Sequence, residues 1–263
     1  MLDSSAWGNR RLIWQFARKD IILRYRGSLL GGIWSVLSPL IMLAIYTFVF
    51  ELVLHAKWSE GSGDTLEYAL NLYPGLLIFN WFAECLGRAP KLIHEQPYLV
   101  NKVVIPLHTL GWGAAISAGT QMYISMGLWF VACMLSGYPL TPHLILLPLV
   151  PILLLPWLLA TVWILSSTGV FLRDLSQVLP ILITSLMFLS PVLYPIKALP
   201  PTLQTLAYLN PLTFGIEALR GLAFKPESLH LWTILISSLT GLLVAFFALW
   251  VFKRLSPYFS DLL

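Results

Sequence analysis

The feature that most constrains this chain is its long stretches without a charged side chain. Residues 103–172 contain no Asp, Glu, Lys or Arg, and neither do residues 27–50, 68–83, 175–196 and 228–252. A helix needs only about 20 mostly apolar residues to cross a bilayer core of roughly 30 Å. Charged residues make up 11% of the chain, against about 25% in an ordinary soluble domain. The sequence therefore predicts an integral membrane protein and excludes a soluble enzyme or a disordered chain.

The charge-free runs also predict how often the chain crosses the membrane. The longest run is divided by a turn over residues 136–143, which holds Gly137, Pro139 and Pro142. The spans must be helical because backbone polar groups in hydrocarbon have to pair within the segment. We expect an all-α protein with a cytoplasmic segment over 1–29, one transmembrane domain over 30–252 and a cytoplasmic tail over 253–263. Its six spans lie near 30–54, 69–88, 107–135, 144–172, 176–194 and 230–252.

The distribution of basic residues predicts the orientation of these spans. Twelve Lys and Arg residues lie before the first span, in the 2–3 and 4–5 loops and in the tail, whereas the opposite side has four. Because Lys and Arg are enriched in cytoplasmic loops, both termini are expected in the cytoplasm. The positive net charge then reflects topology and contact with anionic membrane lipid, and nucleic acid is not an expected partner.

Motifs for catalysis, nucleotide binding and metal binding are absent from the sequence. No lysine is followed by Ser or Thr, which excludes a Walker A loop, and the five dispersed histidines predict no metal site. Cys85 and Cys133 fall inside predicted spans and are expected to be packing residues. Glu84 and Arg88 are four apart on a predicted helix and could form a structural ion pair. No carboxylate is expected near the middle of a span, so the sequence does not favour a proton-coupled transporter.

Four short motifs occur at the start of the first predicted span, before the third, at the end of the fourth and before the sixth. Residues 24–40 (RYRGSLLGGIWSVLSPL) lead from a basic segment through a glycine-rich elbow into the first span. The others are residues 99–106 (LVNKVVIP), 171–175 (FLRDL) and 210–212 (NPL), the last followed by Arg220. Together they resemble the permease subunits of polysaccharide-exporting ABC transporters, the ABC-2 export class. That family often has Phe-Pro where this chain has Ile105-Pro106.

The resemblance implies a chain that works with a separate ATPase. Two copies of the permease pair in the inner (plasma) membrane, and each docks one ATPase subunit, which binds ATP and Mg. This chain would then carry no cofactor and no catalytic residue. A helix between spans two and three is the expected ATPase contact, and an ordinary solvated loop is the alternative. Its candidate residues are Pro90, Lys91, Leu92, Ile93, His94, Glu95 and Gln96, with Leu92, Ile93 and Leu99 forming an apolar face.

Arg173 and Asp174, between spans four and five, are a second candidate for the ATPase contact. The alternative for this pair is an ion pair at a helix end.

Two further segments are expected to form helices that do not span the membrane. Residues 7–26 are expected to form an amphipathic helix on the cytoplasmic surface. This helix would be wedged between lipid and protein, and an uneven or broken helix is the alternative. Residues 195–227 contain too many prolines for one helix and are too apolar for a solvated loop. They predict two short re-entrant helices, which the resemblance implies are a periplasmic gate; a capping loop without gating is the alternative. The candidate gate residues are Pro195, Tyr208, Asn210, Pro211, Phe214 and Arg220.

Aromatic residues make up 13% of the chain and suggest a path for a sugar polymer, because aromatic faces stack on sugar rings. The resemblance implies a channel lined mainly by spans one and five. The candidate residues are Trp34, Tyr46, Phe48, Phe50, Phe188 and Tyr194; contact with lipid or packing is the alternative for each of them.

These observations favour a channel-forming permease that moves lipid-linked polysaccharide, foremost O-antigen, across the inner membrane. Alternatives within the transporter class are export of capsule, teichoic acid, a small lipid or a drug. The alternative from another class is a membrane enzyme acting on lipid-linked sugars.

Overall fold

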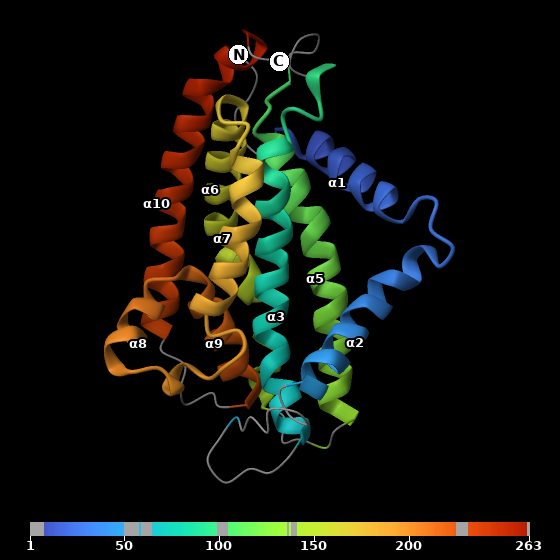
Figure 1. Cartoon of the computed structure of the whole chain (residues 1–263), viewed down its shortest axis with the longest axis vertical. Helices are drawn as coiled ribbons and strands as arrows, with labels where there is room; N and C mark the ends of the chain where they lie inside the picture. The colour runs from blue at the N-terminus through green and yellow to red at the C-terminus, as the bar shows by residue number, and fades with distance from the viewer. Residues whose placement is uncertain are drawn as a thin grey trace.

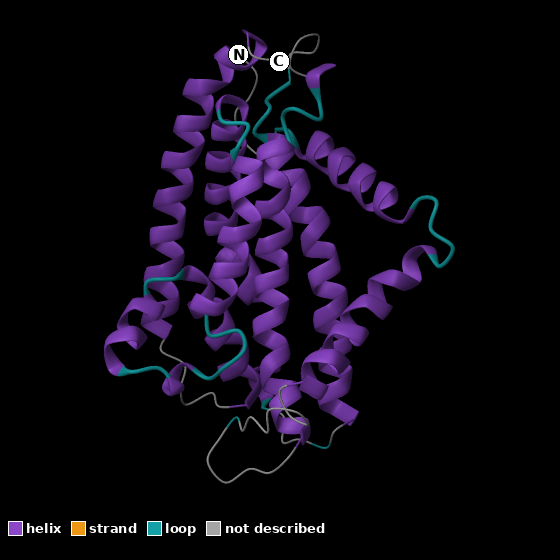
Figure 2. Cartoon of the chain, in the orientation of Figure 1, coloured by secondary structure: helices purple, strands orange, loops and turns teal. Residues whose placement is uncertain are grey.

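The computed structural model describes residues 8–49, 58, 65–98, 105–135, 137, 141–224 and 231–261. Within these ranges every regular element is a helix and no strand is present (Figure 2). The α-helices are α1 (Arg10–Tyr25), α2 (Trp34–Thr47), α3 (Thr65–Arg88), α5 (Thr109–Leu135), α6 (Leu149–Phe171), α7 (Leu175–Leu189), α8 (Pro201–Tyr208), α9 (Pro211–Phe224) and α10 (Leu231–Leu255). Short 3-10 helices include η3 (Ala89–Lys91), η4 (Pro142–Leu146) and η5 (Ile196–Ala198).

The helical fold predicted for this chain is confirmed among the described residues, and so is the presence of long apolar helices. Among the described residues, three helices are long and apolar enough to cross a membrane: Thr109–Leu135, Pro142–Phe171 and Trp232–Ser260. Two shorter helices, Gly31–Tyr46 and Leu175–Leu189, are also apolar. A further helix, α3, is 24 residues long and carries Glu84 and Arg88 in its last turns. The six-span count remains a prediction.

The helices form an upright bundle around α3 (Figure 1). This central helix packs against α2, α5, α6, α7 and α9, while α10 lies at the edge of the bundle along α6. The middle of α3 is buried, with Leu72 and Ile78 fully shielded. The start of α1, the end of α10 and the η3 turn lie toward the same end of the bundle. These three segments carry basic residues: Arg10 and Arg11 in α1, Lys91 in the η3 turn, and Lys253 and Arg254 in α10.

Hydroxyl groups inside the apolar helices bond back to their own backbone. Thr120 donates to the carbonyl of Ile116 at 2.9 Å, Thr168 to that of Ile164 at 2.8 Å and Thr184 to that of Pro180 at 2.9 Å. Since these hydroxyls are satisfied within one helix, they need no water in a hydrocarbon environment. Cys85 and Cys133 are buried free thiols, which confirms their expected packing role.

The amphipathic helix predicted over 7–26 is present and unbroken as α1. Ile13 and Ala17 are buried on the side that packs against α5, whereas Trp14 is 59% exposed. The contact with α5 is close, since a methyl group on Gly113 would come within 2.8 Å of the Phe16 Cβ atom. The described part of α1 therefore has one face on protein and exposed apolar side chains elsewhere, as expected for a wedged helix.

A sharp elbow joins α1 to α2. Gly27 has a φ of +84° and Gly31 a φ of +50°, values that favour glycine because it has no Cβ atom. The two helices meet at this elbow in a V that projects from the bundle beside α3 and α5 (Figure 1). The glycine-rich motif of the sequence is thus the hinge that folds α2 back below α1.

Candidate functional site

The space enclosed by the elbow is a half-open cavity of about 360 Å³. Its walls come from the end of α1, the start of α2 and the facing sides of α3 and α5, and they mix aromatic with polar side chains. The aromatic residues are Tyr25, Trp34, Tyr73 and Trp81, and the polar ones include Arg24, Ser38, Asn80, Glu84, Gln121 and Ser125. Such a mixture suits a ligand that has both apolar faces and hydroxyl or charged groups.

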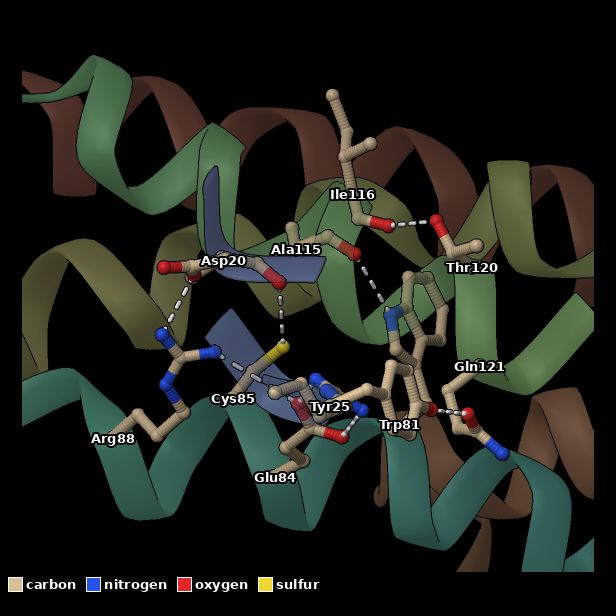
Figure 3. Close-up of polar contacts among 12 residues, drawn as sticks. Asp20, Tyr25, Trp81, Glu84, Cys85, Arg88, Ala115, Ile116, Thr120 and Gln121 are labelled. Carbon is tan, nitrogen blue, oxygen red and sulfur yellow. Dashed lines mark hydrogen bonds and ion pairs between the residues drawn. The ribbon is translucent and has the colours of Figure 1, made fainter. Parts of the chain in front are cut away.

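Four charged residues connect α1 to α3 beside this cavity, and Figure 3 labels three of them, Asp20, Glu84 and Arg88. The guanidinium of Arg24 pairs with both carboxylate oxygens of Glu84, and the guanidinium of Arg88 lies 2.6 Å from the carboxylate of Asp20. Arg88 also lies 3.9 Å from Glu84, which confirms the ion pair predicted from their spacing. We call Asp20, Arg24, Glu84 and Arg88 the elbow network. It fixes the last turns of α1 on the last turns of α3.

Gln121 on α5 ties both arms of the elbow together. Its amide oxygen accepts a hydrogen bond from the Tyr25 hydroxyl at 2.6 Å, and its amide nitrogen donates to the Ser35 carbonyl at 2.5 Å. Trp81 lines the same cavity and donates from its indole nitrogen to the Ala115 carbonyl at 3.2 Å (Figure 3). Three of the side chains that line the cavity, Tyr25, Trp81 and Gln121, are therefore held in position by hydrogen bonds.

Neutralising Glu84 should loosen the elbow. The paired side chains of the network are between 24% and 35% exposed, so solvent screens them and the expected loss is about 1 kcal/mol or less. In purified Glu84→Gln protein we expect an apparent Tm lower by roughly 2–4 °C at low salt, with the difference shrinking at high salt.

Glu95→Gln is the matched control for this measurement, because Glu95 is an exposed carboxylate outside the elbow network. Equal Tm values for the two variants at low salt would contradict the stabilising role of the network.

The residues predicted to contact an ATPase lie in a turn directly after α3. Pro90 and the η3 turn pack on α6 so closely that a Cβ atom on Gly169 would lie 2.6 Å from the Pro90 Cα atom. His94 reinforces this contact, with its Nε2 atom 3.3 Å from the Gly169 carbonyl oxygen. Figure 1 places the turn at the same end of the bundle as the start of α1. We call residues 89–98 the coupling segment.

The apolar face expected on the coupling segment is turned inward. Leu92 and Ile93 are only 7% and 1% exposed and belong to the core of the chain itself, and Leu99 lies outside the described residues. The exposed residues are Lys91, Glu95, Pro97 and Tyr98, while Gln96 is half-buried. Arg173 and Asp174 are also exposed, at the corner between α6 and α7. A partner protein could therefore contact the exposed residues of the coupling segment and the corner at Arg173 and Asp174. Leu92 and Ile93 are buried and could not be contacted.

The structure describes five of the six aromatic residues that were predicted to line the path. Trp34, Phe48 and Phe188 are 40%, 57% and 59% exposed, and Trp34 lines the elbow cavity. Tyr46 is half-buried and packs against the core. The Tyr194 hydroxyl donates to the Phe188 carbonyl at 2.8 Å, which holds the end of α7 against the turn that follows. Phe50 lies outside the described residues.

The region predicted to form a gate contains two short helices, α8 and α9, joined at Asn210. The Asn210 side chain accepts a hydrogen bond from the backbone N–H of Leu212 at 3.0 Å and donates to the Ser190 hydroxyl at 2.8 Å. It therefore caps α9, which begins at Pro211, and anchors the end of α7. Pro195 and Phe214 are half-buried, whereas Tyr208 is 61% exposed at the end of α8.

Arg220 is a buried anchor rather than an exposed gate side chain. It is 6% exposed and donates to the carbonyls of Asn71, Pro191 and Val192 at 2.8, 2.7 and 3.0 Å. It also pairs with Glu217 at 2.9 Å and lies over the Trp58 ring at 4.5 Å from its centroid. One guanidinium thus joins α9, α3 and the turn after α7.

The same turn is held from α3 as well. The Tyr68 hydroxyl donates to the Leu193 carbonyl at 3.0 Å. Gly75 allows the turn to approach, since a Cβ atom there would lie 2.8 Å from the Val192 carbonyl oxygen. We call Ser190–Leu193 the anchored corner. Arg220 was visible in the sequence as a rare charge in an apolar segment, but the backbone carbonyls that it binds leave no pattern in a sequence.

The comparison with known proteins matches most of the chain to one family. The family model described as ABC-2 type transporter matches residues 11–224. The chain is 28% identical to "O-antigen export system permease protein RfbA" of Myxococcus xanthus over 190 residues, 72% of this chain and 70% of that protein. It is 26% identical to a Klebsiella pneumoniae protein of the same name over 248 residues, 93% of this chain and 92% of that protein. The chain therefore belongs to the ABC-2 type transporter family and is a multi-pass membrane component of a transporter rather than an enzyme.

Proposed function

We propose that this chain is the channel-forming permease subunit of an ATP-driven exporter of lipid-linked O-antigen polysaccharide in the inner membrane. The observation that carries the proposal is the similarity to O-antigen export permeases over 93% of the chain. The family supports a transporter, and the elbow cavity, with its aromatic and amide side chains, suits a carbohydrate. In the proposed arrangement the chain crosses the membrane six times and both termini lie in the cytoplasm.

The proposed assembly contains two permease chains and two ATPase subunits, which bind the ATP and Mg. The exposed apolar faces of α2 and α7, with Ile41, Phe48, Ile181 and Phe188, support pairing of two copies around a shared path. The path residues would be Trp34, Tyr46, Phe48, Phe188 and Tyr194. Phe50 is proposed from the sequence alone.

The coupling segment and the corner at Arg173 and Asp174 are the proposed ATPase contacts. Lys91, Glu95, Pro97 and Tyr98 are exposed on the segment, while buried Leu92 and Ile93 tie the segment to the core. A push on the segment would be passed to α3, which it continues directly, and through the elbow network to α1. Helices α8 and α9 are proposed to re-enter the outer leaflet and close the exit, with the anchored corner as their fixed point.

The proposal is tested by purifying the chain with and without its proposed ATPase subunit. The chain alone should not hydrolyse ATP, whereas the complex should, and Glu95→Lys combined with Tyr98→Ala should reduce the amount of ATPase that copurifies. Asp261→Lys, in the short helix after α10, is the control charge change. ATP hydrolysis by the chain in a preparation shown to lack a second subunit would contradict the proposal.

A further inference from the structure

A second hollow, of about 230 Å³, lies between α6, α10 and the start of α5. Its walls are apolar apart from His108 and the indole groups of Trp112 and Trp163. The Trp163 indole N–H donates a hydrogen bond to the His108 carbonyl at 3.0 Å, so this N–H group is satisfied within the protein. We call the hollow the α6–α10 groove. It is half-open and has no role in the functions proposed above.

The length of the groove matches the depth of one membrane leaflet. Its α6 wall extends from Ile152 to Trp163, which corresponds to about 16 Å at 1.5 Å per helical residue. The hydrocarbon core of a bilayer is roughly 30 Å thick. A groove of this length along a membrane helix is suited to one extended acyl chain.

A cation lies at one mouth of the groove. Leu242, Ala245, Phe246 and Leu249 line it from α10, and their spacing places them on one stripe of the helix. Lys253 is the next residue on that stripe, one turn after Leu249, and it is exposed. It is also close enough to His108, which lines the groove, for the two side chains to interact electrostatically. The groove is thus apolar along its length and basic at the end of the bundle where α1 lies.

We propose that the α6–α10 groove binds an anionic phospholipid, with one acyl chain in the groove and the phosphate on Lys253. Anionic lipid headgroups bind basic residues between membrane helices, and the apolar walls accept a chain without unsatisfied polar groups. In the proposed topology the lipid comes from the cytoplasmic leaflet. The bound chain would fill the space between α6 and α10 and act as a structural lipid, independent of the transported polymer.

The test is native mass spectrometry of protein taken from vesicles of phosphatidylethanolamine that contain phosphatidylglycerol as a minor component. Wild-type protein should retain phosphatidylglycerol in preference to phosphatidylethanolamine. Lys253→Gln should reduce that preference about fivefold, as expected for one basic residue at an anionic surface. Leu242→Trp should reduce retention of either lipid because the indole fills the groove.

Each variant has a neighbour as its matched control. Arg254→Gln removes the same charge about 100° further around the helix, and Leu243→Trp adds the same ring at a 69% exposed position outside the groove. Both controls should bind lipid like the wild type. If Lys253→Gln and Arg254→Gln lower the preference for phosphatidylglycerol equally, the preference comes from general surface charge. That result would contradict a lipid site at Lys253. Preferred retention of phosphatidylethanolamine, or of an added polyprenyl phosphate, would overturn the proposed occupant.

Discussion

Replacing Arg220 with methionine should reduce the yield of folded, monodisperse protein at least tenfold. The side chain is buried and donates to three backbone carbonyls, two of them in the anchored corner. A buried polar group that loses its partner costs about 1–3 kcal/mol, and each 1.4 kcal/mol is about a factor of ten in an equilibrium constant. Methionine fills much of the same space but donates nothing. The measurement is the amount of monodisperse protein on size-exclusion chromatography after extraction.

Two substitutions separate the hydrogen bonds of Arg220 from its charge. Glu217→Gln removes the charge of the partner but keeps an acceptor for the guanidinium, and Glu217 is 34% exposed, so this variant should fold well. Arg220→Lys keeps the positive charge but replaces three nitrogens with one, so its yield should fall between those of Arg220→Met and wild type. If Arg220→Met folds as well as Glu217→Gln, the anchored corner is held by other contacts.

Replacing Gly169 with alanine should uncouple the permease from its ATPase. The added Cβ atom would lie 2.6 Å from the Pro90 Cα atom and 2.7 Å from its carbonyl oxygen. Backbone atoms cannot rotate out of the way, so the coupling segment has to shift off α6, at a cost of about 1–3 kcal/mol for overpacking. The variant should still insert in the membrane, because the apolar helices are unchanged. ATP hydrolysis and copurification of the ATPase should both fall several-fold.

Gly87→Ala is the matched control, since it makes the same chemical change near the end of α3. Its Cβ atom would lie 3.7 Å from the Ile183 Cδ1 atom, an ordinary van der Waals contact, and alanine favours a helix over glycine by roughly 1 kcal/mol. This variant should assemble and hydrolyse ATP like the wild type. Normal ATPase assembly in Gly169→Ala would show that the position of the coupling segment on α6 does not govern docking.

The sequence predicted those features of the fold that depend on local chemistry. The spans predicted over 107–135, 144–172 and 230–252 correspond to α5, α6 and α10, because only helices satisfy the backbone polar groups of a single segment in hydrocarbon. The elbow was predicted from Gly27 and Gly31, both of which have positive φ. The pairing of Glu84 with Arg88 followed from a spacing of four residues on one helix.

Contacts between distant residues could not be predicted in the same way. Asp20 and Arg88 are 68 residues apart in the chain, and nothing local in either helix indicates the other. Leu92 and Ile93 show a different difficulty: an apolar side chain has the same appearance in a sequence whether it binds a partner or its own core. The anchored corner rests on carbonyl groups, which every residue has, so only the folded chain identifies the ones that Arg220 binds.

The most direct measurement of the proposed function is the side of the membrane on which the lipid-linked polymer lies. Cells lacking this chain should still synthesise the polymer, but antibody should reach it only after spheroplasts are permeabilised. Restoring the wild-type chain should make the polymer accessible in intact spheroplasts, and restoring Gly169→Ala should not. Accessible polymer in cells without the chain, or complete loss of polymer synthesis, would contradict a permease, and the second result would instead favour a membrane enzyme acting on lipid-linked sugars.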